Sequence, residues 1–408
     1  MSDRTVVLVG TLDTKGDEYA YLRDRLKLHG VSTVLVDVGT LGPPRTQPDI
    51  DRHEVAKAAG VDVEELATAR DRGRAVSAMA EAAAAIARRL HEEGRCDGIL
   101  AAGGSGNTAI ATRAMQALPV GVPKLMVSTV AAGNTRDYIG ASDVTLMASV
   151  TDVAGINSIS GRILANAAAA IAGMVQAPPV ELPEQRPLIA ATMFGVTTPC
   201  VTAAREALEQ RGYEVLVFHA TGTGGMAMEG LIDSGFMTGV LDITTTELCD
   251  RLVGGVLPAG PERLEVAGRN GLPQVVSLGA LDMVNFGARD TVPPQFESRN
   301  LYVHNPSVTL MRTTPEECAE LGRIIARKLT GAQGHVALFI PLKGVSAIDV
   351  DGGPFYDPAA DEALFAALRQ NLSDNVELHE LDHNVNDPEF AKAMVDKLVG
   401  FIEERSAN

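Results

Sequence analysis

The chain has 408 residues, which is enough for two domains with separate cores. Hydrophobic residues make up 46% and charged residues 21%, so an intrinsically disordered protein is not expected. The net charge of -17 disfavours nucleic-acid binding, because such a surface repels phosphate backbones. No apolar run approaches the ~20 residues of a membrane helix, and the start does not resemble a signal peptide. We therefore expect a cytoplasmic protein without membrane contact.

The first half alternates strands with helices. Helical spacing occurs over residues 18–28 and 75–91. Apolar strands joined by helical crossovers predict a parallel sheet with helices on both faces, and so a Rossmann-like α/β fold. Residues 40–74 fit this pattern badly and could form a mobile flap. The strands are expected over residues 6–9, 32–38, 98–104, 124–128 and 144–150.

A proline-rich stretch divides the chain. We predict an N-terminal nucleotide-binding domain over residues 1–178, a linker over 179–187 and a second α/β domain with C-terminal helices over 188–408. The order strand, polar turn, helix, strand and Gly-Thr recurs in both halves, which suggests a duplication. In the second half we expect strands over residues 188–194, 214–219, 239–243, 275–278 and 336–341, and helices over 198–210, 315–329, 358–371 and 388–404.

The strongest local signal is a glycine-rich loop between a strand and a helix. Bare glycine amides and a helix N-terminus favour an anion such as phosphate, and the hydroxyl groups of Ser105 and Thr108 can add hydrogen bonds. The loop is neither a Walker A motif nor a GxGxxG fingerprint, so a tight connection without a ligand stays an alternative. The candidate binding residues are Gly103, Gly104, Ser105, Gly106, Asn107 and Thr108.

Two further loops follow predicted strands and should reach the same sheet edge. In the first loop, residues 10–16, Lys15 could neutralise phosphate charge and Asp13 could hold Mg²⁺. Alternatively, Asp13 and Thr14 cap the next helix and Lys15 faces water. The second loop is small and polar. These loops contribute the candidates Gly10, Thr11, Asp13, Thr14, Lys15, Thr129, Gly133 and Asn134.

The second half offers ionisable groups instead. A histidine with several carboxylates can form an acid/base pair or a metal site, but only the fold would bring them together. The HExxH sequence at 379–383 alternates like a strand, on which the two histidines would lie too far apart for one zinc ion. Metal ligands are therefore left unassigned. The candidate catalytic residues are Glu229, Asp282, His304, Lys343 and Asp357.

Several sequence blocks resemble the Tm-1-like ATP-binding family, also called UPF0261. They include GTLDTKGDE, GGSGNTA, HATGTGGMAMEGLI and PLKGVSAIDVDGGPFYDPAAD, and they span almost the whole chain. The resemblance implies a two-part nucleotide-binding module and favours ATP, with or without Mg²⁺, at the loops of residues 10–16 and 103–108. The plant member of that family also blocks tobamovirus RNA replication by engaging the viral replication protein. It has an additional C-terminal barrel, so we do not transfer the antiviral activity.

Together these features predict a cytoplasmic, homo-oligomeric protein that binds ATP through its glycine-rich loop and takes a small-molecule ligand. Such a protein could couple nucleotide binding to metabolite chemistry in a cleft between the domains. The alternative is a metabolic enzyme, a hydrolase or lyase, that acts on a small carboxylate, sugar acid or keto acid without ATP turnover. An interaction scaffold is the third possibility. The sequence does not fix the reaction.

Overall fold

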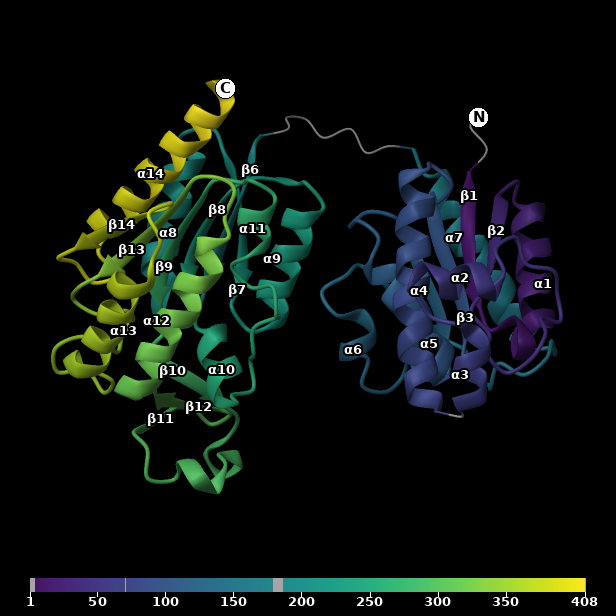
Figure 1. Ribbon diagram of the computed structural model, residues 1–408, viewed down its shortest axis with the longest axis horizontal. Coiled ribbons are helices and arrows are strands. Elements are labelled where there is room, and N and C mark those ends of the chain that lie inside the picture. The colour runs from purple at the N-terminus through teal and green to yellow at the C-terminus, as the bar shows by residue number, and fades with distance from the viewer. Residues whose placement is uncertain (1–3, 70, 179–185, 408) are drawn as a thin grey trace. The chain divides into compact units, whose positions relative to one another are not determined.

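A computed structural model describes residues 4–69, 71–178 and 186–407. The chain divides into two compact units, Met1–Glu181 and Leu182–Asn408, and each is described by itself (Figure 1). Most of the predicted linker, residues 179–185, lies outside the described residues. Each unit has its own parallel sheet, of five strands in the first and six in the second, so the predicted α/β class is confirmed.

The N-terminal sheet has the strand order β2-β1-β3-β4-β5, and every neighbouring pair is parallel. On one side of β1 the sheet therefore contains β2, and on the other side it contains β3, β4 and β5 in chain order. The order changes direction between β1 and β3, where a crevice opens at the carboxyl ends of the strands. The strands are β1 (Thr5–Gly10), β2 (Ser32–Asp37), β3 (Gly98–Gly103), β4 (Lys124–Ser128) and β5 (Thr145–Ala148).

Helices cover both faces of this sheet because its strands are apolar on both sides. Val7 and Val9 pack on one face with α4 and α5, whereas Val6 and Leu8 pack on the other with α1 and α7. The alternation of successive side chains produces this division. The helices are α1 (Leu12–Leu28), α2 (Arg52–Ala58), α3 (Val63–Ala69), α4 (Arg72–Glu92), α5 (Ser105–Gln116), α6 (Arg136–Ile139) and α7 (Ser160–Gln176).

The irregular segment at residues 40–74 contains the short helices α2 and α3. Asp51 caps α2 by accepting hydrogen bonds from the N–H groups of His53 and Glu54. Val55 of α2 and Leu66 of α3 are buried in the same core as α4. The segment is therefore packed onto the first unit, and it carries residues to the edge where β1 and β3 end.

The second unit repeats the order of the first and adds one strand. Its parallel sheet runs β14-β13-β9-β8-β6-β7, so its first five strands in chain order take the same positions as β1 to β5. The shared order is what the predicted duplication requires. The strands are β6 (Leu188–Met193), β7 (Glu214–His219), β8 (Met237–Thr244), β9 (Gln274–Gly279), β13 (Val336–Pro341) and β14 (Val376–Leu381).

One face of this sheet packs on α8 and α14, and the other on α9 to α13. A small antiparallel sheet, β10-β12-β11, follows β9 and was not predicted. Its strands are β10 (Met283–Phe286), β11 (Leu301–Asn305) and β12 (Val308–Arg312). The helices are α8 (Thr198–Glu209), α9 (Thr223–Asp233), α10 (Glu247–Val253), α11 (Val266–Arg269), α12 (Pro315–Thr330), α13 (Pro358–Asn371) and α14 (Pro388–Ala407), with 3₁₀ turns at Gly195–Thr197, Arg289–Thr291 and Pro294–Phe296. Among the described residues, no helix is both long and apolar enough to span a bilayer.

Candidate functional site

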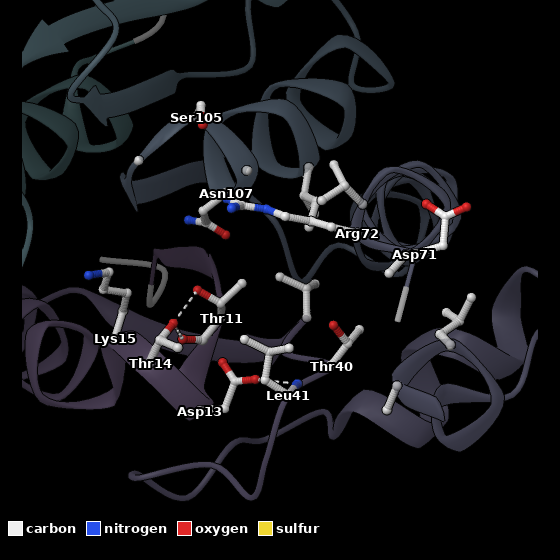
Figure 2. A pocket seen from close by; sticks show the side chains of 18 of the residues that line it. Thr11, Asp13, Thr14, Lys15, Thr40, Leu41, Asp71, Arg72, Ser105 and Asn107 are labelled. Atoms are coloured by element: carbon white, nitrogen blue, oxygen red, sulfur yellow. Dashed lines mark hydrogen bonds between the residues drawn. The ribbon is translucent and has the colours of Figure 1, made fainter. Parts of the chain in front are cut away.

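A cavity of about 670 Å³ opens in the first unit where β1 and β3 diverge. Its walls come from the loop after β1, the N-terminus of α5 after β3, residues that follow β2, and α3 and α4 (Figure 2). Ligand pockets of proteins commonly have volumes of about 300 to 1,000 Å³. Size and position therefore make this cavity the candidate site.

The helix after β3 begins without a side-chain cap. Gly104 is the N-cap residue, and among the described residues no side chain accepts a hydrogen bond from the first turn of α5. Such free N–H groups, together with the helix dipole, attract an anion. Gly104 and Gly106 have space around them, since a Cβ atom at Gly104 would meet only Thr129 Oγ1 at 3.8 Å. Because Gly104, Ser105 and Gly106 line the cavity, these amides are accessible to a ligand.

A buried tyrosine fixes the position of this loop relative to β1. The Tyr19 hydroxyl donates to the carbonyl oxygen of Val9 at the end of β1, and accepts from the Ala102 N–H of β3 at 2.9 Å. It also accepts from Asn107 Nδ2 at 2.9 Å. The ring lies beneath Gly10, where a Cβ atom would come within 2.2 Å of it. Gly10 is therefore a packing residue that gives the tyrosine room.

Two cationic side chains reach the cavity. Lys15 is half-buried and lies at a kink in α1, where its φ and ψ are -123° and 20°. Arg72 begins α4, and its guanidinium would lie 3.4 Å from a Cβ atom at Gly106. Within the described part of the chain, neither cation forms an ion pair with a carboxylate. Arg72 is thus available to a ligand anion beside the start of α5, and Lys15 offers a second cation in the lining of the same cavity.

Two carboxyl groups at this edge are held by backbone amides. Asp13 Oδ2 accepts from the N–H groups of Leu41 at 2.7 Å and Gly42 at 3.3 Å. Asp37 Oδ1 accepts from the N–H groups of Leu12 and Gly39, and burial raises the pKa of Asp37 above its usual value. Asp13 therefore does not cap α1 but fixes the segment that follows β2 against the cavity.

The structure brings most of the predicted binding residues together. Thr11, Asp13, Thr14, Lys15, Gly104, Ser105, Gly106, Asn107 and Thr129 all line the cavity. Gly10, Gly103, Thr108, Gly133 and Asn134 do not. Thr108 instead bonds to the Gly104 carbonyl and to Ser128 Oγ at 2.7 Å, so its hydroxyl stabilises the turn.

Sequence reasoning missed the other wall of the cavity. It lies in and beside the segment at 40–74, which had no recognisable motif. Arg72 was hidden in a charged run, although its place at the start of a helical pattern, after the potential cap Asp71, was a usable signal. The missed lining residues are Val38, Thr40, Leu41, Leu66, Ala67, Asp71, Arg72, Ala75, Val76, Ile110 and Asp152.

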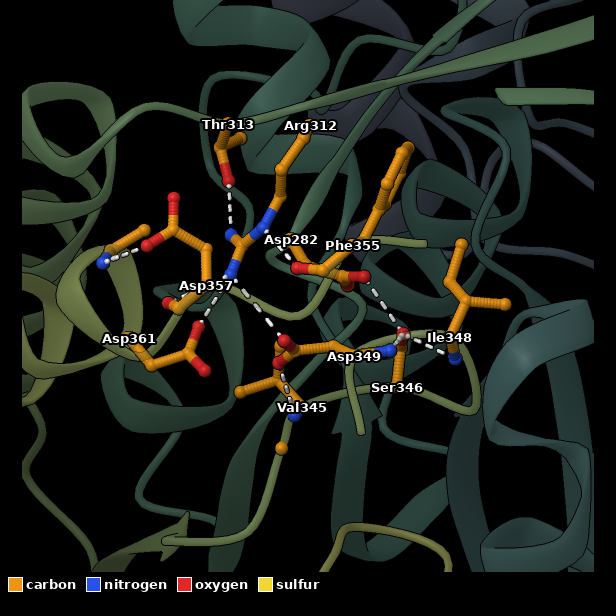
Figure 3. A network of polar contacts seen from close by, with 12 residues as sticks. Asp282, Arg312, Thr313, Val345, Ser346, Ile348, Asp349, Phe355, Asp357 and Asp361 are labelled. Carbon is orange, nitrogen blue, oxygen red and sulfur yellow. Dashed lines mark hydrogen bonds and ion pairs between the residues drawn. The ribbon is translucent and has the colours of Figure 1, made fainter. Parts of the chain in front are cut away.

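The five candidate catalytic residues of the second unit occupy different environments. His304 is exposed on β11, and Lys343 is exposed and paired with Asp382 at 2.8 Å. Glu229 is buried near Arg263, and burial raises its pKa to about 7. Asp282 and Asp357 both flank Arg312 (Figure 3). The structure therefore does not gather these residues around one cavity.

Figure 3 shows Arg312 of β12 among several carboxyl groups. Its guanidinium bonds Asp361 Oδ1 at 2.6 Å and the carbonyl oxygen of Phe355 at 2.8 Å. Asp282 is fully buried and accepts from Ser346 Oγ at 2.7 Å, and its burial raises its pKa. The Asp357 carboxylate caps α13 through the N–H groups of Ala359 and Ala360. These contacts connect the antiparallel sheet to α13, which is a structural role.

The glycine-rich turn of the second unit already contains an anion from the protein itself. Glu247 Oε1 accepts from the N–H groups of Gly222 at 2.6 Å and Gly225 at 3.1 Å, at the start of α9. Its other oxygen accepts from Arg263 Nε at 2.8 Å. The turn thus has the anion preference expected of a helix N-terminus, and Glu247 satisfies it. The corresponding groups of α5 have no such side-chain partner in the part of the chain that the structure describes.

The HExxH sequence lies on and after a strand, as predicted. His379 belongs to β14 and stacks on Phe339 with 4.5 Å between ring centroids. His383 follows the strand and lies 3.3 Å from a carboxylate oxygen of Asp387. In the described parts of the two units, no three His, Cys, Asp or Glu side chains gather as metal ligands.

Strand order, helical layers and the open cavity beside α5 thus define an α/β protein of two parallel-sheet units with a ligand-sized site in the first. Residues 4–179 match the N-terminal domain of an uncharacterised protein family (UPF0261), and residues 186–402 match its C-terminal domain. The chain belongs to this family.

Relatives confirm the membership. A UPF0261 protein of Clostridium tetani is 53% identical over 403 residues, which cover 98% of this chain and 100% of that protein. A UPF0261 protein of Rhizobium meliloti is 50% identical over 394 residues, covering 96% and 98%. The ToMV resistance protein Tm-1(GCR237) of Solanum lycopersicum is 41% identical over 416 residues. That alignment covers 97% of this chain but 55% of the tomato protein.

Solved structures match only weakly. The glycosyltransferase SnogD from Streptomyces nogalater is 12% identical, with 98% of this chain and 100% of that chain covered and a TM-score of 0.20. A UDP-N-acetylglucosamine 2-epimerase from Rickettsia bellii is 11% identical, with coverages of 98% and 97% and a TM-score of 0.23. Scores this low support no inference about the ligand.

Proposed function

We propose that the cavity of the first unit binds a nucleotide, with ATP as the favoured ligand, and that its phosphates lie against the start of α5. One observation carries the proposal: the uncapped N-terminus of α5 opens into a cavity that also contains Lys15 and Arg72. Free amides with two unpaired cations suit a ligand that carries several negative charges.

The remaining walls suit the rest of a nucleotide. Leu66 of α3, Val76 of α4 and Ile110 of α5 give an apolar surface on which a base can pack. Thr11 and Thr40 add hydroxyl groups to the lining of the cavity. A mostly apolar pocket with a few placed polar groups is the usual form of a small-molecule site.

Magnesium would enter with the phosphates. The described residues form no group of three metal ligands, and Mg²⁺ in nucleotide sites is commonly held by phosphate oxygens, water and one or two carboxylates. A single carboxylate such as Asp13 or Asp152, both of which line the cavity, suffices for such a complex. The bound ion would offset phosphate charge.

The substitution Gly104→Asp tests the proposal. Gly104 has φ -82° and ψ -171°, which any residue can adopt, and only Thr129 lies near its Cβ position. Aspartate is a preferred N-cap residue, so the variant should be as stable as the parent chain or more so. Its carboxylate would occupy the anion position. We expect ATP affinity, measured by calorimetry, to fall by about 100-fold or more, as for a buried charged contact.

Gly104→Ala is the matched control, because it adds a methyl group without charge and should keep most of the affinity. If Gly104→Asp binds ATP as tightly as the parent chain, the phosphates do not lie at α5. If the parent chain binds no nucleotide, the proposal as a whole is wrong. The expected homo-oligomer stays a prediction.

A further inference from the structure

The segment that follows β2 carries an exposed leucine at the edge of the cavity. Leu41 lines the cavity and is 83% exposed. The backbone around it is fixed, because the Leu41 N–H donates to Asp13 Oδ2 at 2.7 Å and Arg52 donates to the carbonyl oxygen of Gly42. The fold therefore holds Leu41 in place without burying its apolar side chain, so this side chain contributes little to the core.

The order of the sheet places Leu41 at the end of the cavity opposite the start of α5. Leu41 follows β2, whereas Gly104 and Ser105 follow β3, and β1 lies between these two strands. Neighbouring strands are about 4.8 Å apart, so the ends of β2 and β3 are separated by roughly 10 Å. Figure 2 shows Ser105 and Leu41 on opposite sides of the cavity. A nucleotide with its phosphates at α5 can therefore extend along this edge of the sheet toward Leu41.

The chemistry at this end of the cavity suits a nucleobase. Val38, which directly follows β2, also lines the cavity, as does Leu66 of α3 from the same hydrophobic core. A phosphate or a ribose gains nothing from an exposed leucine, because both are strongly hydrated. The flat face of a base, by contrast, leaves water favourably when it packs on apolar side chains. Of the three parts of a nucleotide, the base therefore fits Leu41.

We propose that Leu41 packs against the base of the nucleotide and holds the base at the end of β2. This inference rests on the proposed nucleotide-binding function. It adds the direction in which the nucleotide lies, from α5 across the end of β1 to the segment after β2. Binding covers the leucine and removes apolar surface of both partners from water. Leu41 is thereby a base-contact residue, separate from the groups that hold the phosphates.

The substitution Leu41→Ala tests this contact. The full chain and the variant are titrated by calorimetry with ATP and with inorganic triphosphate, at one magnesium concentration. We expect the affinity of Leu41→Ala for ATP to fall about 5-fold and its affinity for inorganic triphosphate to stay within about 2-fold of the parent chain, because only ATP has a base. Leu28→Ala is the control, since Leu28 is 74% exposed at the end of α1 and is not among the described residues that line the cavity. It should change neither affinity.

Fluorescence gives a second readout, because the chain contains no tryptophan. The variant Leu41→Trp places a single indole ring at the expected position of the base, and the exposure of residue 41 leaves room for it. We expect ATP to quench its emission, since a nucleobase stacks on an aromatic ring, and inorganic triphosphate to leave the emission unchanged. Leu28→Trp is the control, and its emission should respond to neither ligand.

The inference fails, while nucleotide binding stands, if the base makes no contact with Leu41. An ATP affinity that is unchanged in Leu41→Ala, or an emission of Leu41→Trp that is unchanged when calorimetry shows bound ATP, would place the base elsewhere. Equal losses of affinity for ATP and inorganic triphosphate in Leu41→Ala would also overturn it, because Leu41 would then act on the phosphate-binding loop. If the parent chain binds neither ligand, the inference is wrong together with the proposed function.

Discussion

The carboxyl group of Asp250 on α10 is fully buried and should make the second unit sensitive to pH. One oxygen accepts from the N–H of Asn285 at 2.6 Å, and the other from its Nδ2 at 2.8 Å. Burial nevertheless raises the pKa of Asp250 from 3.8 to about 7, with a further increase from the nearby Glu247 charge. The substitution Asp250→Asn removes this titration and keeps an oxygen for the Asn285 N–H.

The sign of the effect follows from proton counting. Between about pH 4 and pH 7 the folded chain holds a proton on Asp250 that the unfolded chain has lost, so unfolding releases a proton. Stability therefore falls as pH rises through this window, by about 1.4 kcal/mol per pH unit. Over the whole pKa shift the free energy of unfolding of the parent chain falls by about 4 kcal/mol, and that of Asp250→Asn does not.

Urea unfolding followed by circular dichroism at several pH values between 4 and 9 measures this difference. We expect the stability of Asp250→Asn relative to the parent chain to increase up to about pH 7 and then to stay constant. Asp233→Asn, on the surface of α9, controls for the loss of one negative charge. A difference between Asp250→Asn and the parent chain that does not change with pH would refute the reasoning.

Two further substitutions test stability. Val150 has a φ of 61° and an 81% exposed side chain, so Val150→Gly should stabilise the chain by about 1 kcal/mol in chemical unfolding, and a destabilised variant would show that no strain is stored there. Arg263 is buried between Asp242 and Glu247, so Arg263→Met should destabilise the second unit by about 3 to 5 kcal/mol. The half-exposed Arg269 gives the comparison, because Arg269→Ala should cost under about 1 kcal/mol, and equal losses would contradict the electrostatic argument.

The parallel sheets could be predicted because their strands are continuous apolar runs between helical segments. Residues 6–9 and 336–341 are buried on both faces, and such strands carry a strong local signal. The antiparallel sheet of residues 283–312 had no such signal. Its outer strand β11 is largely exposed and its register depends on β12, so tertiary contacts rather than local pattern define it.

The candidate site was only partly predictable. Glycine and lysine in the loops after β1 and β3 pointed to an anion, since both loops end at one sheet edge. The second glycine-rich turn looked equivalent in sequence, but Glu247, 22 residues after Gly225, fills it. Contacts between residues so far apart in the sequence follow no fixed spacing that a motif could reveal. For the same reason the candidates Glu229 and Asp282 could not be assigned to their separate clusters beforehand.

The hydroxyl of Tyr19 joins the ends of β1 and β3 to the first turn of α5. The loop that faces the cavity is therefore set in place when the chain folds, and the loss of conformational freedom is incurred at that stage. An incoming molecule would find its partners already aligned and would need to immobilise little more than itself. A loop held in this way by Tyr19 implies that a ligand associates rapidly and that the protein loses little conformational entropy on binding.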